Sequence, residues 1–228
     1  MSPSASGKNR KHKKTTRKTV DKKRAANEHE IFGMRILKSS HPDIRQLKAR
    51  GHHPSIHGNK FWKSTWLIMD YLREHPPRKR PRVLEVGCGW GLAGLFCVRE
   101  FRAKLTSLDA DDAVFPYLLR HAELNGVKAS TWKCRYENVR KKDLCNFDLI
   151  IGADICFWDE MTRPLFNLVS RAQKVGGVRV VLCDPGRSPF TKMAEKCVDR
   201  FGAGFVDWSV AHPGNASGFV LDVPATRQ

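Results

Sequence analysis

The sequence predicts an α/β fold built on a mostly parallel, doubly wound sheet of seven strands. From residue 83 onward, short β-rich runs alternate with helical segments, a pattern that indicates right-handed βαβ crossovers. After the last helical segment, two β-rich runs flank Pro213-Gly214-Asn215, which predicts a C-terminal antiparallel hairpin. A chain of 228 residues with 41% hydrophobic content is long enough for one sizeable core.

The part of the chain before this sheet divides in two. Residues 1–27 consist of Ser, Lys, Arg and Thr with almost no large apolar side chains, so we expect a disordered basic tail. In residues 28–77 we expect an irregular segment over Ile31–Gly58 and then an amphipathic helix over Phe61–Leu72, which Pro76-Pro77 ends.

Residues 78–228 are expected to form the sheet domain after a basic linker. The predicted strands are Val83–Val86, Lys104–Leu108, Ala129–Cys134, Phe147–Gly152, Val178–Cys183, Phe205–Val210 and Phe219–Val223. The predicted helices are Leu92–Phe101, Ala113–Leu124, Glu160–Lys174 and Phe190–Phe201.

The charge of the chain predicts an acidic partner. Lys and Arg number 41 against 23 Asp and Glu, which gives a net charge of +18. Lys8 to Arg24 alone supply ten basic residues and one acid, Asp21. This tail is interpreted either as a solubilising extension or as an electrostatic arm for RNA, the ribosome or an acidic protein.

Cysteine usage indicates a reducing compartment, and we expect a cytoplasmic protein without membrane spans. Seven cysteines form no CxxC pair and mostly lie in apolar runs, as buried thiols of intracellular proteins do. His52, His53 and His57 raise the possibility of a zinc site, but no Cys or carboxylate stands at ligand spacing. We therefore expect no metal and favour a polar loop on the substrate side.

The most informative motif is the strand, turn and helix start from Val83 to Gly94. Gly87, Gly89 and Gly91 allow positive φ angles or a close approach of the backbone to a ligand, so a flat polar cofactor is able to lie against the turn. Glu85 is expected to orient the turn or to meet the amino group of a methionine moiety. Asp109 ends the next strand, where it is placed to accept hydrogen bonds from ribose hydroxyls. Together with the terminal hairpin, these residues predict a Rossmann-like methyltransferase domain that binds S-adenosylmethionine (SAM).

A dinucleotide-binding interpretation competes with this one, because Gly89 to Gly94 reads GxGxxG. Four features argue against a dehydrogenase. They are the additional Gly87 with Glu85 before it, the short chain, the terminal hairpin, and the absence of a Tyr followed four residues later by Lys.

A second polar group follows the buried strand Phe147–Gly152, at the edge of the sheet where open α/β folds bind ligands. Asp154 is placed to attract and orient a substrate ammonium, and the faces of Phe157 and Trp158 to surround it by cation–π attraction worth about 0.5 to 2 kcal/mol. The structural alternative is that Asp159 caps a helix and Phe157 packs in the core.

These residues resemble the seven-β-strand protein lysine methyltransferases of family 16. The resemblance covers about Gly58 to Val223. It includes Phe61 to Leu67, similar to a family segment whose Trp lies beside the cofactor, and this implies such a place for Trp62. Asp154-Ile155-Cys156-Phe157 is similar to the family's D-x-x-Y element with Phe in place of Tyr, and Leu182 to Phe190 resembles the branch that methylates the electron-transfer flavoprotein β-subunit.

The resemblance implies a SAM-dependent enzyme that N-methylates a lysine side chain of a protein. In this hypothesis Asp154 and Phe157 are catalytic, and Trp62, Glu85, Gly87, Gly89, Gly91, Asp109 and Asp154 bind the cofactor. One alternative is a methyltransferase that acts on RNA or on a small molecule. The basic tail favours RNA, whereas the absence of an N-P-P-[YF] string argues against it. Another is a non-catalytic SAM-binding scaffold.

Overall fold

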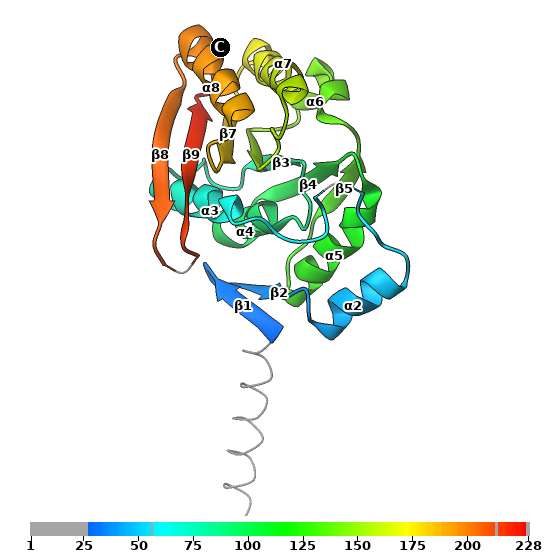
Figure 1. Ribbon diagram of the computed structural model, residues 1–228. Helices are drawn as coiled ribbons and strands as arrows, with labels where there is room; N and C mark the ends of the chain where they lie inside the picture. Colours follow the sequence, from blue (N-terminus) through cyan, green and yellow to red (C-terminus); the bar gives the residue numbers. More distant parts are fainter. Residues whose placement is uncertain (1–26, 56, 213, 227–228) are drawn as a thin grey trace, which may run out of the picture.

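The computed structural model describes residues 27–55, 57–212 and 214–226 and has the predicted architecture (Figure 1). Seven strands form one sheet in the order β5-β4-β3-β6-β7-β9-β8. Strands β3 to β7 are parallel, while β9 pairs antiparallel with both β7 and β8. The predicted Rossmann-like sheet with its C-terminal antiparallel hairpin is thereby confirmed.

The elements of the sheet domain follow the sequence pattern closely. Its strands are β3 (Arg82–Val86), β4 (Lys104–Asp109), β5 (Ser130–Lys133), β6 (Leu149–Ala153), β7 (Arg179–Asp184), β8 (Gly204–Val210) and β9 (Ala216–Val223). Its helices are α3 (Ser64–Glu74), α4 (Leu92–Phe101), α5 (Phe115–Leu124), α6 (Lys141–Leu144), α7 (Asp159–Val175) and α8 (Ser188–Phe201), with 3₁₀ turns at Asp112–Val114 and Tyr136–Asn138.

Alternate side chains of the central strands build two cores, one on each face of the sheet. Val83, Ile151 and Val181 belong to the core that α3, α4 and α5 cover. Their neighbours Leu84 and Ile150 belong to the core under α6, α7 and α8. Both faces of a parallel sheet are covered in this way, which explains why the central strands read as continuous apolar runs.

The expectation of irregular structure over Ile31–Gly58 is wrong for its first half. Two short antiparallel strands, β1 (Glu28–Ile31) and β2 (Met34–Leu37), are joined by Phe32 and Gly33, both with positive φ angles of 50° and 72°. Helix α2 (Pro42–Ala49) follows, with Pro at its start and the His41 side chain accepting the Asp43 amide. The remainder of the loop, from residue 50 to residue 63, has no helix or strand among its described residues.

The β1–β2 hairpin is fixed to α5 by two side chains. Asn125 accepts the Arg35 amide at 2.8 Å and donates to the Arg35 carbonyl at 2.9 Å. The Leu37 amide donates to Nε2 of His121, a fully buried residue, at 3.1 Å. Met34, Ile36 and Leu37 lie in the same core as α3 and α4.

The basic tail expected over residues 1–27 lies outside the described part of the chain, apart from Asn27. Within the described part, no helix is long and apolar enough to cross a membrane.

Candidate active site

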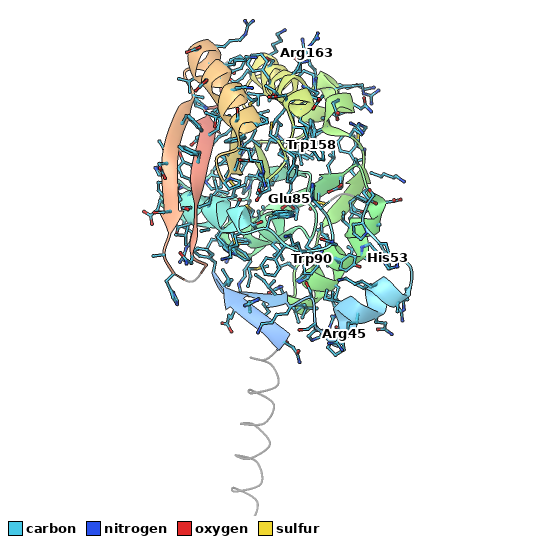
Figure 2. All side chains as sticks on the ribbon, in the orientation of Figure 1. Arg45, His53, Glu85, Trp90, Trp158 and Arg163 are labelled. Carbon is cyan, nitrogen blue, oxygen red and sulfur yellow. The ribbon has the colours of Figure 1, made fainter. Side chains whose placement is uncertain are left out.

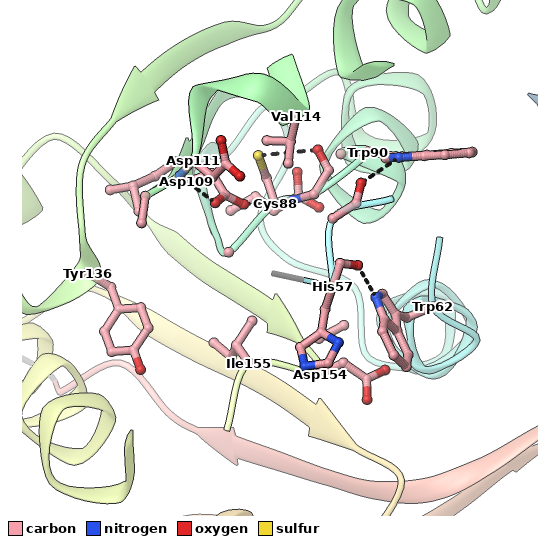
Figure 3. Close-up of a pocket in the computed structure, with 18 of the residues that line it drawn as sticks. His57, Trp62, Cys88, Trp90, Asp109, Asp111, Val114, Tyr136, Asp154 and Ile155 are labelled. Atoms are coloured by element: carbon pink, nitrogen blue, oxygen red, sulfur yellow. Dashed lines mark hydrogen bonds between the residues drawn. The ribbon is translucent and has the colours of Figure 1, made fainter. Parts of the chain in front are cut away.

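A cavity of about 380 Å³ opens at the carboxyl ends of β3, β4 and β6, and the loop before α3 forms part of its wall (Figure 3). In an open α/β sheet this crevice is the usual place for a ligand. The structure brings together the expected catalytic and cofactor-binding residues, whereas Trp158, which was expected to surround the amine with Phe157, is not among the residues that line the cavity. The cavity is lined by Trp62, Glu85, Gly87, Gly89, Gly91, Asp109, Asp154 and Phe157.

The glycine turn between β3 and α4 has one open and two crowded positions. Gly87, Gly89 and Gly91 all have positive φ angles, of 60°, 49° and 71°. A Cβ at Gly87 would lie 2.5 Å from Cγ2 of Ile155, and one at Gly91 would collide with Leu118. A Cβ at Gly89 would meet no atom within 4 Å. Gly89 therefore leaves its backbone free to contact a ligand, whereas Gly87 and Gly91 permit packing.

Glu85 lies at the centre of the molecule (Figure 2) and is only 4% exposed. Its Oε1 accepts the Gly94 amide of α4 at 3.1 Å, and its Oε2 accepts the Ser107 hydroxyl of β4 at 3.1 Å. Burial raises the pKa of Glu85 to about 7. These contacts orient the turn by joining β3, β4 and the first turn of α4.

Asp109 fixes the other side of the turn. Its Oδ2 accepts the Gly89 amide at 3.0 Å, and its Oδ1 accepts the Asp111 amide at 3.0 Å. Burial raises the pKa of this carboxyl group as well. Because each carboxylate oxygen has two acceptor sites, these bonds leave capacity for ligand hydroxyls.

Asp154 follows β6 and is held in the left-handed region, with a φ of 54°. Its Oδ1 accepts Nη1 of Arg187 at 2.6 Å, and the same nitrogen donates to Oδ2 of Asp184 at 2.7 Å. The Arg187 guanidinium also lies 4.4 Å from the ring centre of Phe157. Arg187 therefore already makes the two kinds of contact, with a carboxylate and an aromatic face, that we expected a substrate ammonium to make.

Aromatic rings gather at this end of the cavity. Phe157 stacks on His57 with ring centres 4.3 Å apart, and Trp62 meets Phe157 edge to face at 5.8 Å. Lys60 lies 4.3 Å above the Trp62 ring. Trp158 is 47% exposed at the rim and is the cap residue of α7. The alternative in which Asp159 is this cap is therefore wrong.

Sequence reasoning missed two groups at the site, Arg187 and Glu137. Arg187 follows β7, and a signal for it existed, since Asp154 and Asp184 end adjacent parallel strands and require a cation between them. His57 was expected only as part of a polar loop on the substrate side, and the fold places its ring against Phe157. Glu137, paired with Arg135 at 2.8 Å, lines the cavity after β5.

Two of the three clustered histidines do not line this cavity. His52 contributes its carbonyl, which accepts the Tyr117 hydroxyl at 2.6 Å, and His53 is exposed. Within residues 27–55, 57–212 and 214–226, no three His, Cys, Asp or Glu side chains lie close enough together to hold a metal ion.

Comparison with known proteins identifies the family. Residues 42–193 match the family model described as lysine methyltransferase, a span well over half of the chain. The chain belongs to this family. The match begins at α2 and ends within α8, so it includes the glycine turn, Asp109, Asp154 and Arg187.

Relatives of this chain include two named protein methyltransferases. The electron transfer flavoprotein beta subunit lysine methyltransferase of Xenopus laevis is 25% identical over 140 residues, which are 59% of this chain and 56% of that protein. The calmodulin-lysine N-methyltransferase of Arabidopsis thaliana is 27% identical over 121 residues, 50% of this chain and 40% of that protein. The chain thus spans about half the length of the curated relatives it matches.

The fold of this family member is shared with solved methyltransferases. The ribosomal protein L11 methylase from Lactobacillus delbrueckii subsp. bulgaricus superimposes with a TM-score of 0.53 at 17% identity, over 74% of this chain and 81% of that chain. The arrangement of the sheet is therefore that of a Rossmann-like methyltransferase.

Proposed function

We propose that this chain is a SAM-dependent methyltransferase that N-methylates a lysine side chain of a protein substrate. One observation carries the proposal. A single cavity contains two groups of residues. The glycine turn and Asp109 suit a nucleoside, and Asp154 with the neighbouring aromatic rings suits an amine. Membership of the lysine methyltransferase family supports the same reaction class.

The residues present fit SAM. Gly89 has open space where a side chain would stand, so the backbone of the turn is able to approach the cofactor. Asp109 retains acceptor capacity for the ribose hydroxyls beyond its two amide bonds. Trp62 also lines this cavity. A cavity of about 380 Å³ is within the range usual for cofactor sites.

SAM supplies a methyl group on a sulfonium, whose transfer is an in-line displacement that needs no covalent enzyme intermediate. The protein therefore acts by positioning and by excluding water. Phe157 and Trp62 present ring faces and edges to the substrate, and cation–π attraction to an amine cation is worth about 0.5 to 2 kcal/mol. Asp154 adds a carboxylate that shares the Arg187 guanidinium with Asp184, so its charge is offset only in part and it is able to orient the substrate amine.

Two measurements test the proposal. Calorimetry should detect SAM binding, which separates an enzyme or SAM-binding scaffold from a protein of another kind. Labelled methyl transfer into a lysate should then survive RNase and disappear with protease, and hydrolysis of the labelled protein should yield methyl-lysine. Label that is lost with RNase, or that remains in small molecules, would instead establish one of the alternative substrates. SAM binding without any transfer would establish the scaffold.

The Asp109→Asn variant tests the cofactor geometry. Loss of the charged acceptor should weaken SAM binding at least tenfold, since a hydrogen bond to a charged group contributes about 1.5 to 3 kcal/mol. Asp112→Asn is the matched control, because Asp112 is a nearby exposed carboxylate that pairs with Lys133 outside the cavity. Equal SAM affinities in the two variants would remove Asp109 from the cofactor site.

A cytoplasmic location is part of the proposal. All seven cysteines are free, and burial raises the pKa of the Cys88, Cys97 and Cys183 thiols, which keeps them protonated and unreactive. Such thiols suit a reducing compartment. Fractionation of cells that express a tagged chain should recover it with cytosolic markers.

A further inference from the structure

The amine end of the cavity contains a histidine to which the proposed function assigns no role. His57 lies in the loop between α2 and α3, and its exposed imidazole stacks on Phe157 and meets Trp62 edge to face at 5.6 Å. Nε1 of Trp62 donates to the His57 carbonyl at 2.9 Å. Figure 3 shows the His57 ring beside Asp154 at the same end of the cavity.

The loop that carries His57 is fastened to the walls of the cavity. Nε1 of Trp90 donates to the Gly58 carbonyl at 3.0 Å. The Ser55 amide and hydroxyl both donate to Asp111, at 2.6 and 2.8 Å. His57 is therefore held in position by contacts on both sides of it in the sequence, although its side chain is open to solvent.

The carboxylates that line or border this end of the cavity are already engaged. Asp154 and Asp184 share Nη1 of Arg187, and Asp184 also accepts the amides of Gly186 and Arg187. Glu85 is buried beneath the turn, with both oxygens bonded to protein donors. Oδ1 of Asp154 and both oxygens of Asp184 therefore already accept hydrogen bonds from protein donors.

Two other titratable groups in the cavity wall, Tyr136 and Cys88, are also unsuited to accept a proton. Burial raises the pKa of the Tyr136 hydroxyl and of the Cys88 thiol, so both remain protonated at neutral pH. Charged groups lie close to the rings that contact His57: Lys60 is 4.3 Å from the ring centre of Trp62, and Arg187 is 4.4 Å from that of Phe157. Arg187 is paired in turn with Asp154 and Asp184.

We propose that His57 is a catalytic residue that accepts the proton which the substrate lysine loses before methyl transfer, an inference that rests on the proposed function. An N–H bond of the ammonium breaks and its proton bonds to an imidazole nitrogen of His57. The freed lone pair forms the N–C bond as the C–S bond of the donor breaks, with that electron pair remaining on sulfur. The exposed imidazolium then releases its proton to water. Histidine is the side chain that most often serves as a general base in enzymes.

The His57→Phe variant tests this role, because phenylalanine retains the stacking on Phe157 but accepts no proton. His53→Phe is the matched control, an exposed histidine of the same loop outside the cavity. Initial rates of labelled methyl incorporation into a fixed amount of lysate protein are measured from pH 6.5 to 9.5, and SAM binding is measured by calorimetry.

We expect His57→Phe to bind SAM as the wild type does and to be slower by about a hundredfold at pH 7, within the range typical of acid–base catalysis. The deficit should shrink as pH rises, because free amine becomes more abundant in solution. A wild-type rate at pH 7, or an equal deficit at every pH, would overturn the role of His57 while leaving the proposed function intact. If the wild-type chain neither binds SAM nor transfers label, the proposed function itself fails.

Discussion

Glu85 is an acid whose protonation the fold controls. Its side chain is enclosed between β3, β4 and the start of α4, where it accepts one amide and one hydroxyl hydrogen bond. Two neutral donors do not replace the hydration of a full negative charge, so burial is the main cause of its raised pKa of about 7. The residue therefore stabilises the turn best when it is protonated.

This predicts a pH-dependent effect of Glu85→Gln. The folded pKa lies above the ordinary value of 4.5, so the contribution of Glu85 is complete below pH 4.5 and is lost as pH rises through about 7. The free energy of unfolding of the variant minus that of the wild type should rise by about 3 kcal/mol over this interval. Urea denaturation at several pH values measures it, and a difference independent of pH would contradict the prediction.

Arg187 alters the expected chemistry of Asp154. From the sequence alone, Asp154 was expected to meet the substrate as a charged acid. In the folded chain Arg187 links it to Asp184, and the two carboxylate side chains are 2% and 0% exposed. An unpaired buried carboxylate pair would be costly, so the arginine is required for the strand ends to lie side by side. The charge of Asp154 is consequently offset only in part, because Arg187 is shared with Asp184.

At the scale of elements, the glycines of the β3–α4 turn are required for two different reasons. Gly91 packs against Leu118 of α5, and Gly89 faces open space, although both have positive φ angles. Strain from the backbone is similar at the two positions, but only Gly91 is also limited by neighbouring atoms. Stability and ligand binding therefore depend on different glycines of one motif.

The pair Gly89→Ala and Gly91→Ala should distinguish these two reasons. Gly91→Ala should lower the free energy of unfolding by about 1 to 3 kcal/mol more than Gly89→Ala, because overpacking adds to the φ strain. Gly89→Ala should retain more stability but weaken SAM binding at least tenfold, because the new methyl group points into the space left for the ligand. Thermal denaturation and calorimetry measure the two effects. Equal stabilities would contradict the assignment.

The sequence pattern predicted the elements of the sheet domain because a helix or strand that buries one face has apolar residues at regular intervals. β-rich runs marked all seven strands, and the ends of the predicted helices agreed to within a few residues, but the short helix α6 was not predicted. The β1–β2 hairpin was missed because each strand has four residues and the turn is Phe32-Gly33. Phenylalanine is an uncommon residue at positive φ, so the usual Asn-Gly signal was absent.

The sequence predicted those site residues that lie at the ends of strands. Glu85, the three glycines, Asp109 and Asp154 stand at strand ends and line one cavity. Trp62 was placed there by resemblance alone. The contacts that complete the site, those of Arg187 and His57, join segments distant in sequence and arise only from the tertiary fold.

At the scale of the whole molecule, buried His121 connects the N-terminal hairpin to the sheet domain. Its Nε2 accepts the Leu37 amide, and its Nδ1 lies 2.7 Å from the Tyr117 carbonyl, as in a neutral ring protonated on Nδ1. Burial lowers the pKa of His121 to about 4. Protonation of Nε2 would remove the acceptor that holds β2.

His121→Gln should therefore change the acid sensitivity of the fold. Because the folded pKa is about 4 and the ordinary value is 6.5, the stabilising contribution of neutral His121 is complete above pH 6.5 and is lost as pH falls toward 4. The wild-type minus variant free energy of unfolding should fall by about 3 kcal/mol across that interval. Denaturant titrations at pH 4.5, 5.5 and 7 measure it, and a constant difference would show that His121 contributes only by packing.

The position of β3 in the middle of the sheet has a consequence for biosynthesis. This strand pairs on one side with β4, which follows soon after it, and on the other with β6, which the ribosome makes some 65 residues later. Asp154 and Phe157 come later still. A nascent chain that has produced only the glycine turn thus has half of a crevice, so the cofactor should not be able to assist folding until translation has passed β6.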